Sequence, residues 1–260
     1  SDQMTSSSDR TVVHVLRHGE VHNPEGVLYG RLPDYHLSER GRAMADRAAE
    51  ALAGRDIARV VASPLDRAQE TAAPIAAVHG LEIVTDPRVI EADNVFEGQR
   101  VGVGDGVLRQ PRAWRHLWNP FTPSWGEPYI ELAERMTEAI GSARDEARGR
   151  ETVIVSHQLP IWVCRLDAEN RSFVHDPRRR QCNLASLTSF TFEDDRFVAI
   201  SYTEPAADLA ALPFVVGNNA DGSARVVRLG QIAEVVDATG PNQINRRNLN
   251  REVAISANVY

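Results

Sequence analysis

Cysteine is scarce in this sequence, and the two that occur, Cys164 and Cys182, lack the short spacings that bind zinc. A disulfide scaffold is not expected from this pair, and buried free thiols are the default prediction. Apolar runs of membrane-spanning length are also missing, and no signal-peptide pattern opens the chain. We therefore expect no membrane partner, and the cytoplasm is the simplest compartment.

Positive charge is in the minority. The sequence holds 29 basic and 36 acidic residues, which gives a net charge of −7. That balance argues against general affinity for nucleic acid, although it leaves room for a local basic pocket. The hydrophobic share of 42% is ordinary for a globular protein with a sizeable core. A chain of 260 residues fits one large domain, or one domain with an appendage.

A short β-branched run, residues 12–16, ends abruptly in Arg17-His18-Gly19. The run predicts a buried strand, and ligands bind at the carboxyl ends of strands in open α/β sheets. A neutral imidazole is a competent nucleophile near pH 7, and an adjacent guanidinium can hold an anionic ester. Glycine lets backbone and substrate come close. The alternative is that His18 is simply a polar residue at a strand end.

A second apolar strand, residues 58–62, leads into Ser63-Pro64 and a helix. Ser63 is expected to cap this helix, and Pro64 suits its first position. Arg67 then falls in the first helical turn, where its guanidinium can reach the same anionic ester as Arg17. The alternative is a surface arginine that pairs with Glu70.

A third strand, residues 152–156, is followed directly by His157, whose imidazole can meet the same anionic ester. The alternative is that His157 caps the helix that follows it. Apolar residues recur at helical spacing after Ser38 and after Pro128, which predicts two further helices. Ser38 suits the N-cap of the first of them. Residues 184–202 are expected to form a β-hairpin that closes the domain.

Three motifs carry a resemblance to a known family: Arg17-His18-Gly19, the segment from Ser63 to Thr71, and Val155-Ser156-His157-Gln158. Over residues 11–208 the chain resembles the histidine phosphatase superfamily, the phosphoglycerate-mutase-like enzymes. The resemblance implies an α/β three-layer sandwich, with a mostly parallel central sheet and helices on both faces. It also implies phosphomonoester hydrolysis through a phosphohistidine on His18, with Arg17, Arg67 and His157 binding the phosphate and no metal or other cofactor. Gln158 departs from the family, which usually has glycine there.

The proton donor is the least settled residue of the expected site. Many family members carry an acidic residue in a segment that aligns with residues 89–98, and Glu91 matches it best. Asp93 and Glu97 are the other candidates, because the aromatic pattern around them departs from the commoner one. A partly buried carboxyl beside a phosphate would have its pKa raised, as a general acid requires.

Residues 99–126 are rich in glycine, proline and tryptophan, and they correspond to the region that forms a lid in the family. Trp114 and Trp118 are candidate substrate contacts that suit an apolar or ring-bearing leaving group. The alternative is that they only pack the lid onto the domain. Asn23 and Arg31 are further candidate contacts near the expected pocket, although a structural or solvated role for Arg31 is the competing interpretation.

The two ends of the chain differ from the middle. Residues 1–10 are polar and read as a disordered leader, residues 11–210 as the phosphatase domain, and residues 211–260 as a β-rich extension of unknown role. Residues 220–260 resemble a fragment of the porter region of resistance-nodulation-division efflux pumps. A gene fusion or a small β appendage would both explain it, and its edge strands offer a route to a homo-oligomer.

The leading hypothesis is a phosphatase acting on a small phosphorylated molecule. No long insertion of the kind that glycolytic mutases carry is obvious, so a phosphoglycerate-type mutase is the alternative enzyme. A non-catalytic phosphoester-binding or adaptor protein is the third reading, and the intact histidine motifs argue against it. The sequence leaves the natural substrate open.

Overall fold

The computed structural model describes residues 9–94 and 126–207, and the backbone of residues 213–218, 224–228, 246–247 and 250–251. The chain divides into two compact units, Ser1–Ala207 and Asp208–Tyr260. Most of the expected leader and of the expected lid, including Trp114, Trp118 and Glu97, lies outside the described residues.

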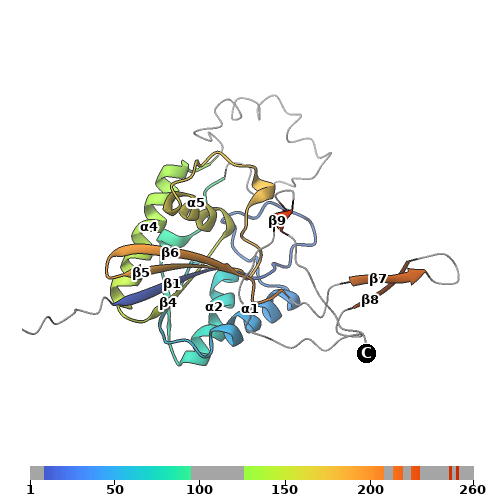
Figure 1. Ribbon diagram of the computed structural model, residues 1–260, viewed down its shortest axis with the longest axis horizontal. Helices are drawn as coiled ribbons and strands as arrows, with labels where there is room; N and C mark the ends of the chain where they lie inside the picture. The colour runs from blue at the N-terminus through green and yellow to red at the C-terminus, as the bar shows by residue number, and fades with distance from the viewer. Residues whose placement is uncertain are drawn as a thin grey trace, which may run out of the picture. The chain divides into compact units, whose positions relative to one another are not determined.

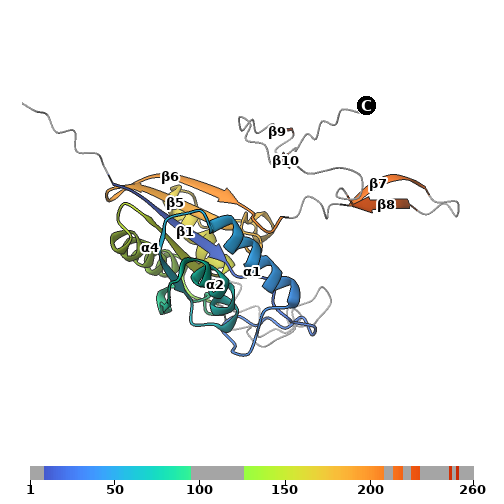
Figure 2. The ribbon, with the colours of Figure 1, turned by 90° about the horizontal axis from the view of Figure 1, so that it is seen from below.

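A six-stranded sheet forms the centre of the first unit (Figure 1). Its strands are β1 (Arg10–Arg17), β2 (Ile57–Ala62), β3 (Ile83–Thr85), β4 (Glu151–Ser156), β5 (Leu187–Glu193) and β6 (Arg196–Thr203). They lie in the order β3-β2-β4-β1-β5-β6. The first four are parallel, whereas β5 is antiparallel to β1 and β6 antiparallel to β5. Figure 2 shows the hairpin of β5 and β6 beside β1.

Helices cover both faces of this sheet, which confirms the predicted three-layer α/β sandwich. Helices α1 (Glu39–Leu52) and α2 (Asp66–His79) lie on one face, and α4 (Tyr129–Glu146) and α5 (Gln158–Ala168) on the other (Figure 1). Ser38 caps α1 as expected, because its hydroxyl accepts a hydrogen bond from the Gly41 amide at 3.0 Å. Two short 3₁₀ turns, Pro87–Val89 and Pro177–Arg179, also occur among the described residues of this unit.

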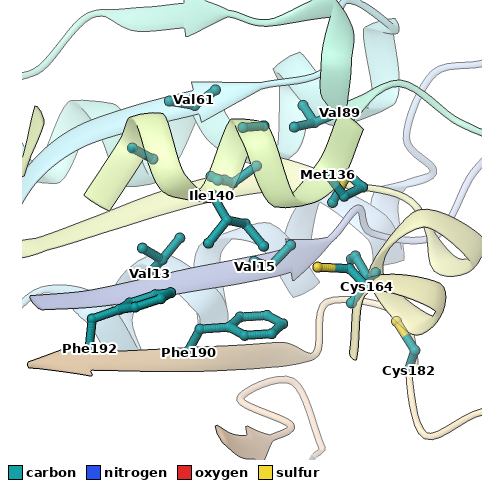
Figure 3. Packing of buried hydrophobic residues seen from close by; sticks show 14 residues of the cluster. Val13, Val15, Val61, Val89, Met136, Ile140, Cys164, Cys182, Phe190 and Phe192 are labelled. Carbon is teal, nitrogen blue, oxygen red and sulfur yellow. The ribbon is translucent and has the colours of Figure 1, made fainter. Parts of the chain in front are cut away.

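The alternation of side chains along β1 divides the core into two layers. Val13 and Val15 pack against Met136 and Ile140 of α4 (Figure 3), while Leu16 packs on the α1 and α2 side. Both cysteines are free, buried thiols, as predicted. Because the sheet is filled on both faces, the strand ends that carry polar residues are held rigidly.

Two helix starts differ from the sequence-based expectation. Helix α2 begins at Asp66 with Leu65 at its N-cap, so the prediction that Ser63 caps it is wrong. Pro74 lies inside this helix, which continues to His79. His157 occupies the N-cap position of α5, but its side chain makes no capping hydrogen bond, which removes the capping alternative for this histidine.

The second unit contains two small hairpin-like sheets in its described backbone. Strand β7 (Pro213–Asn218) pairs with β8 (Ala224–Arg228), and β9 (Arg246–Arg247) pairs with β10 (Asn250–Arg251), both antiparallel. Across the described residues, no helix combines the length and apolar character needed to cross a membrane.

Candidate active site

Three neighbouring parallel strands end at one edge of the sheet and bring the predicted site residues together. In the register of the sheet, Arg17 of β1 lies opposite Ser156 of β4, and Val155 lies opposite Ala62 of β2. The next residue of each strand therefore emerges at the same place. The His18 amide donates to the Ser156 carbonyl at 3.1 Å, which fixes the turn out of β1.

His18 is held in a defined tautomer. Its side chain is almost fully buried, with 2% of its surface exposed. Its Nδ1 lies 2.8 Å from the carbonyl oxygen of Gly19, which can only accept, so Nδ1 carries the hydrogen and Nε2 keeps its lone pair. Burial, helped by the charges of Arg67 and Arg17, lowers the pKa of His18 to about 3. The imidazole is therefore neutral, and its Nε2 is ready to act as a nucleophile at physiological pH.

His157 stands beside this nucleophile. The two imidazole centres are 5.2 Å apart, and both side chains are buried. The Nε2 of His157 lies 2.8 Å from the hydroxyl of Ser63, which itself accepts the Leu65 amide at 3.4 Å. This contact positions the imidazole beside His18. The other ring nitrogen, Nδ1, is buried and has no hydrogen-bond partner among the described residues.

Two arginines supply positive charge next to the histidines. Arg17 donates to the Cys182 carbonyl at 2.7 Å, while its buried Nε has no partner among the described residues. Arg67 is 1% exposed, donates to the Gly30 carbonyl and places its guanidinium 4.7 Å from the ring centre of Tyr29. Arg67 is thus a buried cation in the first turn of α2, and the surface pair with Glu70 that was the alternative does not form.

Glu91 lies in the same pocket as the histidine nucleophile. Its Oε1 accepts the Ala92 amide at 2.9 Å. Burial raises the pKa of Glu91, against the opposing charges of Arg67, Arg17 and Arg135. A carboxyl with a raised pKa keeps its proton to higher pH, which is the property a general acid needs.

An arginine clamp, made by Arg31 and Arg135, fixes the backbone that carries Glu91. Arg31 Nε donates to the Glu91 carbonyl at 2.7 Å, and Arg135 donates to the Ile90 carbonyl at 2.8 Å and the Glu91 carbonyl at 3.3 Å. Both guanidiniums also pair with Glu127, at 3.1 Å from Arg31 and 2.7 Å from Arg135. Burial alone would raise the pKa of Glu127, but these arginines outweigh it and the pKa lies below its ordinary value.

Of these groups, Arg17, His18 and Glu91 line a cavity of about 300 Å³, whereas Arg67 and His157 are not among its lining residues. The described residues that line it include Arg17, His18, Tyr29, Glu91, Asp93, Tyr129, Gln158 and Arg180. A larger hollow of about 430 Å³ lies around His14 at the opposite end of β1, but it contains none of the predicted site residues. The chemistry therefore points to the smaller cavity, which suits a compact ligand.

The family model of the histidine phosphatase superfamily, branch 1, matches residues 13–205. The chain belongs to the histidine phosphatase superfamily. Its members are phosphatases or mutases. The match ends at residue 205, so the resemblance of residues 220–260 to an efflux-pump fragment gains no support from it and stays a prediction.

Bacterial relatives match the chain over almost their full length. An uncharacterized protein of Mycobacterium tuberculosis, Rv0525, is 60% identical over 199 residues, which cover 76% of this chain and 98% of the relative. A probable phosphoglycerate mutase, GpmB, of Yersinia pestis is 30% identical over 207 residues, covering 77% of this chain and 94% of the relative.

Solved structures of superfamily proteins match the fold. YhfR of Bacillus stearothermophilus superimposes with a TM-score of 0.61 at 26% identity, covering 72% of this chain and 94% of that one. The mycobacterial glucosyl-3-phosphoglycerate phosphatase Rv2419c gives a TM-score of 0.58 at 26% identity, with 74% and 97% covered. The phosphoglycerate-mutase-like fold predicted from the motifs is thereby confirmed.

Other predicted contacts of this histidine phosphatase domain take different places. Both ends of the Asn23 amide bind Val27, its Nδ2 donating to the carbonyl at 2.8 Å and its Oδ1 accepting the amide at 3.1 Å, so Asn23 closes its own loop. Arg31 serves the backbone of Glu91. Gly19 was expected to make room for substrate, but a Cβ there would lie 2.5 Å from the Gly41 carbonyl of α1. Its small size instead lets the loop pack on a helix.

The ends of the segment that would form the lid of this superfamily domain meet at the pocket. Asn94 and Gly126 form an antiparallel bridge, and the Glu127 amide donates to the Asp93 carbonyl at 3.2 Å. A Cβ on Gly126 would approach that carbonyl to 2.7 Å, so only glycine fits. Residues 93 and 94 on one side and 126 and 127 on the other are thus fixed against each other beside Glu91.

One surface group of the superfamily domain has metal-binding atom types. Asp34, His36 and Asp66 place ligand atoms within 4.8 Å of one another at the surface. His36 is already hydrogen-bonded to Glu70, and none of the three lines the cavity at His18.

The sequence did not predict three contacts of the site: Ser63 with His157, Arg135 with the backbone of Glu91, and Glu127 with Arg135. The first two of these contacts join residues that are far apart in the chain.

Proposed function

We propose that this protein hydrolyses small phosphomonoesters through a phosphohistidine on His18. The observation that carries the proposal is the state of that imidazole. It is neutral, its Nδ1 hydrogen is committed to the Gly19 carbonyl, and its Nε2 belongs to a pocket that Arg17 and Glu91 also line. Such a group can attack phosphorus without first losing a proton.

The first step transfers the phosphoryl group to the protein. His18 Nε2 attacks phosphorus, a P–N bond forms, and the P–O bond to the leaving group breaks. The leaving oxygen takes the proton of the Glu91 carboxyl, so the alcohol departs neutral and Glu91 becomes a carboxylate. The raised pKa of Glu91 keeps this proton available before the step.

The second step returns the protein to its starting state. A water molecule attacks the phosphorus of phosphohistidine, gives a proton to the Glu91 carboxylate, and the P–N bond breaks. Inorganic phosphate leaves, His18 is again neutral and Glu91 is again protonated. The same carboxyl thus acts as acid and then as base.

Donors on three strand ends stabilise the charge that shifts between phosphoryl oxygens in both steps. Arg17 and Arg67 supply fixed positive charge, and the buried Nδ1 of His157, which lacks a partner among the described residues, can donate to a phosphoryl oxygen when it carries the ring hydrogen. Such preorganised donors lower the barrier most where water is excluded. This arrangement explains why no bound cofactor enters the proposed steps.

A mutase, which returns the phosphoryl group to a substrate hydroxyl instead of to water, shares the first step. The chain is similar both to a phosphatase, at 26% identity, and to a probable mutase, at 30% identity. Both reactions therefore occur among its relatives. We favour the phosphatase, and a small phosphorylated molecule as substrate fits the cavity of about 300 Å³.

Phosphoryl labelling tests the proposal. The full chain is incubated briefly with a ³²P-labelled aryl phosphate, quenched, and tested for protein-bound label that is acid-labile and base-stable. We expect label in the parent protein and in His22→Ala, whose imidazole lies outside the cavity lining, and none in His18→Ala. Label that survives in His18→Ala would refute the nucleophile. Label without release of inorganic phosphate would favour the mutase.

A further inference from the structure

The cavity has a second cationic wall that the proposed chemistry does not use. Arg180 lines it together with Tyr129, Gln158 and Leu159. Its neighbours Arg178 and Arg179 are exposed, whereas Arg180 is partly buried. The side chain thus differs from the rest of its basic loop, because it turns into the pocket.

A neutral histidine orients this arginine. Arg180 Nε donates to His175 Nε2 at 2.8 Å, and His175 Nδ1 donates to the Phe173 carbonyl at 2.7 Å. The carbonyl can only accept, so the His175 hydrogen sits on Nδ1 and Nε2 is free to accept from Arg180. The His175 ring also packs near Tyr129 and Trp162, with centre distances of 6.1 and 6.0 Å. These contacts hold the guanidinium plane in one orientation.

The charge of Arg180 is not neutralised within residues 9–94 and 126–207. No carboxylate there forms an ion pair with it, and its two terminal nitrogens donate to no described residue. The contrast with Arg31, Arg135 and Arg178 is plain, since each of these is paired with a glutamate or an aspartate. Burial accordingly lowers the pKa of Arg180. Withdrawing a cation from water without a partner costs free energy, which an anionic ligand would repay.

We propose that Arg180 binds a second anionic group of the substrate, a carboxylate or a second phosphate carried by the leaving group. The inference rests on the proposed function, because it takes the phosphoryl end of the substrate to lie at His18. Arg180 is then a specificity residue, distinct from the arginines that hold the transferred phosphate.

The geometry suits this role in two ways. With Nε held by His175, the terminal nitrogens present two parallel N–H groups, which match the two oxygens of a carboxylate or phosphate. The charge of Arg180 also lies near enough to Arg17 and Glu91 to interact with both. A ligand of a few carbon atoms can therefore span from the reacting phosphate to Arg180 within a cavity of about 300 Å³.

A matched series of ligands isolates the second anion. Propyl phosphate, 3-(phosphonooxy)propanoate and propane-1,3-diyl bisphosphate share one phosphate and a three-carbon chain, and they differ only at the far end. Their dissociation constants are measured by calorimetry in the full-length His18→Ala protein, so that no ligand is consumed. The comparison is repeated with Arg180→Gln added, and with Arg179→Gln added as the control at the exposed neighbour.

We expect at least one of the two ligands that carry a second anionic group to bind about 10- to 100-fold more tightly than propyl phosphate. This is the range for a hydrogen bond to a charged group. The ligand that gains more identifies the second anion as carboxylate or phosphate. Arg180→Gln should reduce this preference to less than about threefold, and Arg179→Gln should preserve it. A parent protein without the preference, an equal loss for all three ligands in Arg180→Gln, or no binding of any of them would overturn the inference. Because the readout is binding, a protein that failed the labelling test could still show the preference, which separates the two proposals.

Discussion

The buried active-site histidines, His18 and His157, make a quantitative prediction about stability and pH. In the unfolded chain a histidine titrates at its ordinary pKa of 6.5, whereas the pKa of His18 is lowered to about 3 by burial and by the charges of Arg67 and Arg17. Below pH 6.5 the unfolded chain therefore binds a proton that the folded protein refuses. The free energy of unfolding must fall as the pH drops from 6.5 towards 3.

The magnitude follows from the size of the shift. One proton bound only by the unfolded chain changes the free energy of unfolding by about 1.4 kcal/mol per pH unit. At pH 5 the loss from His18 is about 2 kcal/mol, because 1.5 units separate pH 5 from the ordinary pKa. His157, whose pKa burial lowers well below its ordinary value, adds a loss in the same direction. The loss from His18 alone is a substantial part of a typical domain stability of about 5–15 kcal/mol.

Urea unfolding at intervals between pH 5 and 6.5 measures this dependence. His18→Gln and His157→Gln each remove one titrating group, so each should flatten the slope of stability against pH by about 1.4 kcal/mol per unit. Gln158→Ala changes the same pocket without removing a titratable group, and it should keep the parent slope. A His18→Gln protein with the parent slope would show that His18 is not held neutral. The reasoning about the nucleophile would then be wrong as well.

Four further predictions can be checked with simple variants. Glu91→Gln should slow hydrolysis of alkyl phosphates much more than of nitrophenyl phosphate, whose leaving group needs little protonation, and equal slowing would assign the acid elsewhere. Ser63→Ala leaves His157 Nε2 buried without its partner. The variant should lower the free energy of unfolding, measured by urea titration, by about 1–3 kcal/mol, and it should also lower kcat. Unchanged stability and kcat would contradict this prediction. A chain that stops after Ala210 should fold and keep the phosphatase rate, and a folded but inactive truncation would place part of the pocket in the extension. Chelator treatment should leave the rate unchanged, whereas a loss that added metal restores would show a metal requirement.

The sequence was most informative where a residue is defined by its position at a strand end. Strand periodicity and the residue that follows each strand were enough to predict that His18 and His157 would meet, because parallel strands share one carboxyl edge. Arg67 followed from the first turn of a helix that begins at the same edge. In all three cases the local sequence places the side chain at the end of a strand or the start of a helix. The register of the sheet then brings these ends together.

Prediction was weaker where a side chain serves a distant partner. A serine before a proline reads as a helix cap, yet Ser63 bonds His157, 94 residues away. Arg135 is one of several charged residues on a helix, and nothing in its neighbourhood announces that it holds the backbone of Glu91, 44 residues earlier. Arg180 is likewise the last of three consecutive arginines in the sequence. Only the fold distinguishes it, because burial beside His175 is a tertiary property.

The closed junction at Asn94 and Gly126 has a consequence for how this domain can change. The two ends of the intervening segment are joined by a backbone bridge and by the hydrogen bond from the Glu127 amide to the Asp93 carbonyl, and the carboxylate of the same Glu127 pairs with the arginine clamp that holds Glu91. The two chain positions that flank residues 95–125 are therefore fixed against each other and against the backbone of Glu91. We expect a change of sequence or length between residues 94 and 126 to leave the proposed proton donor, Glu91, at the same distance from His18.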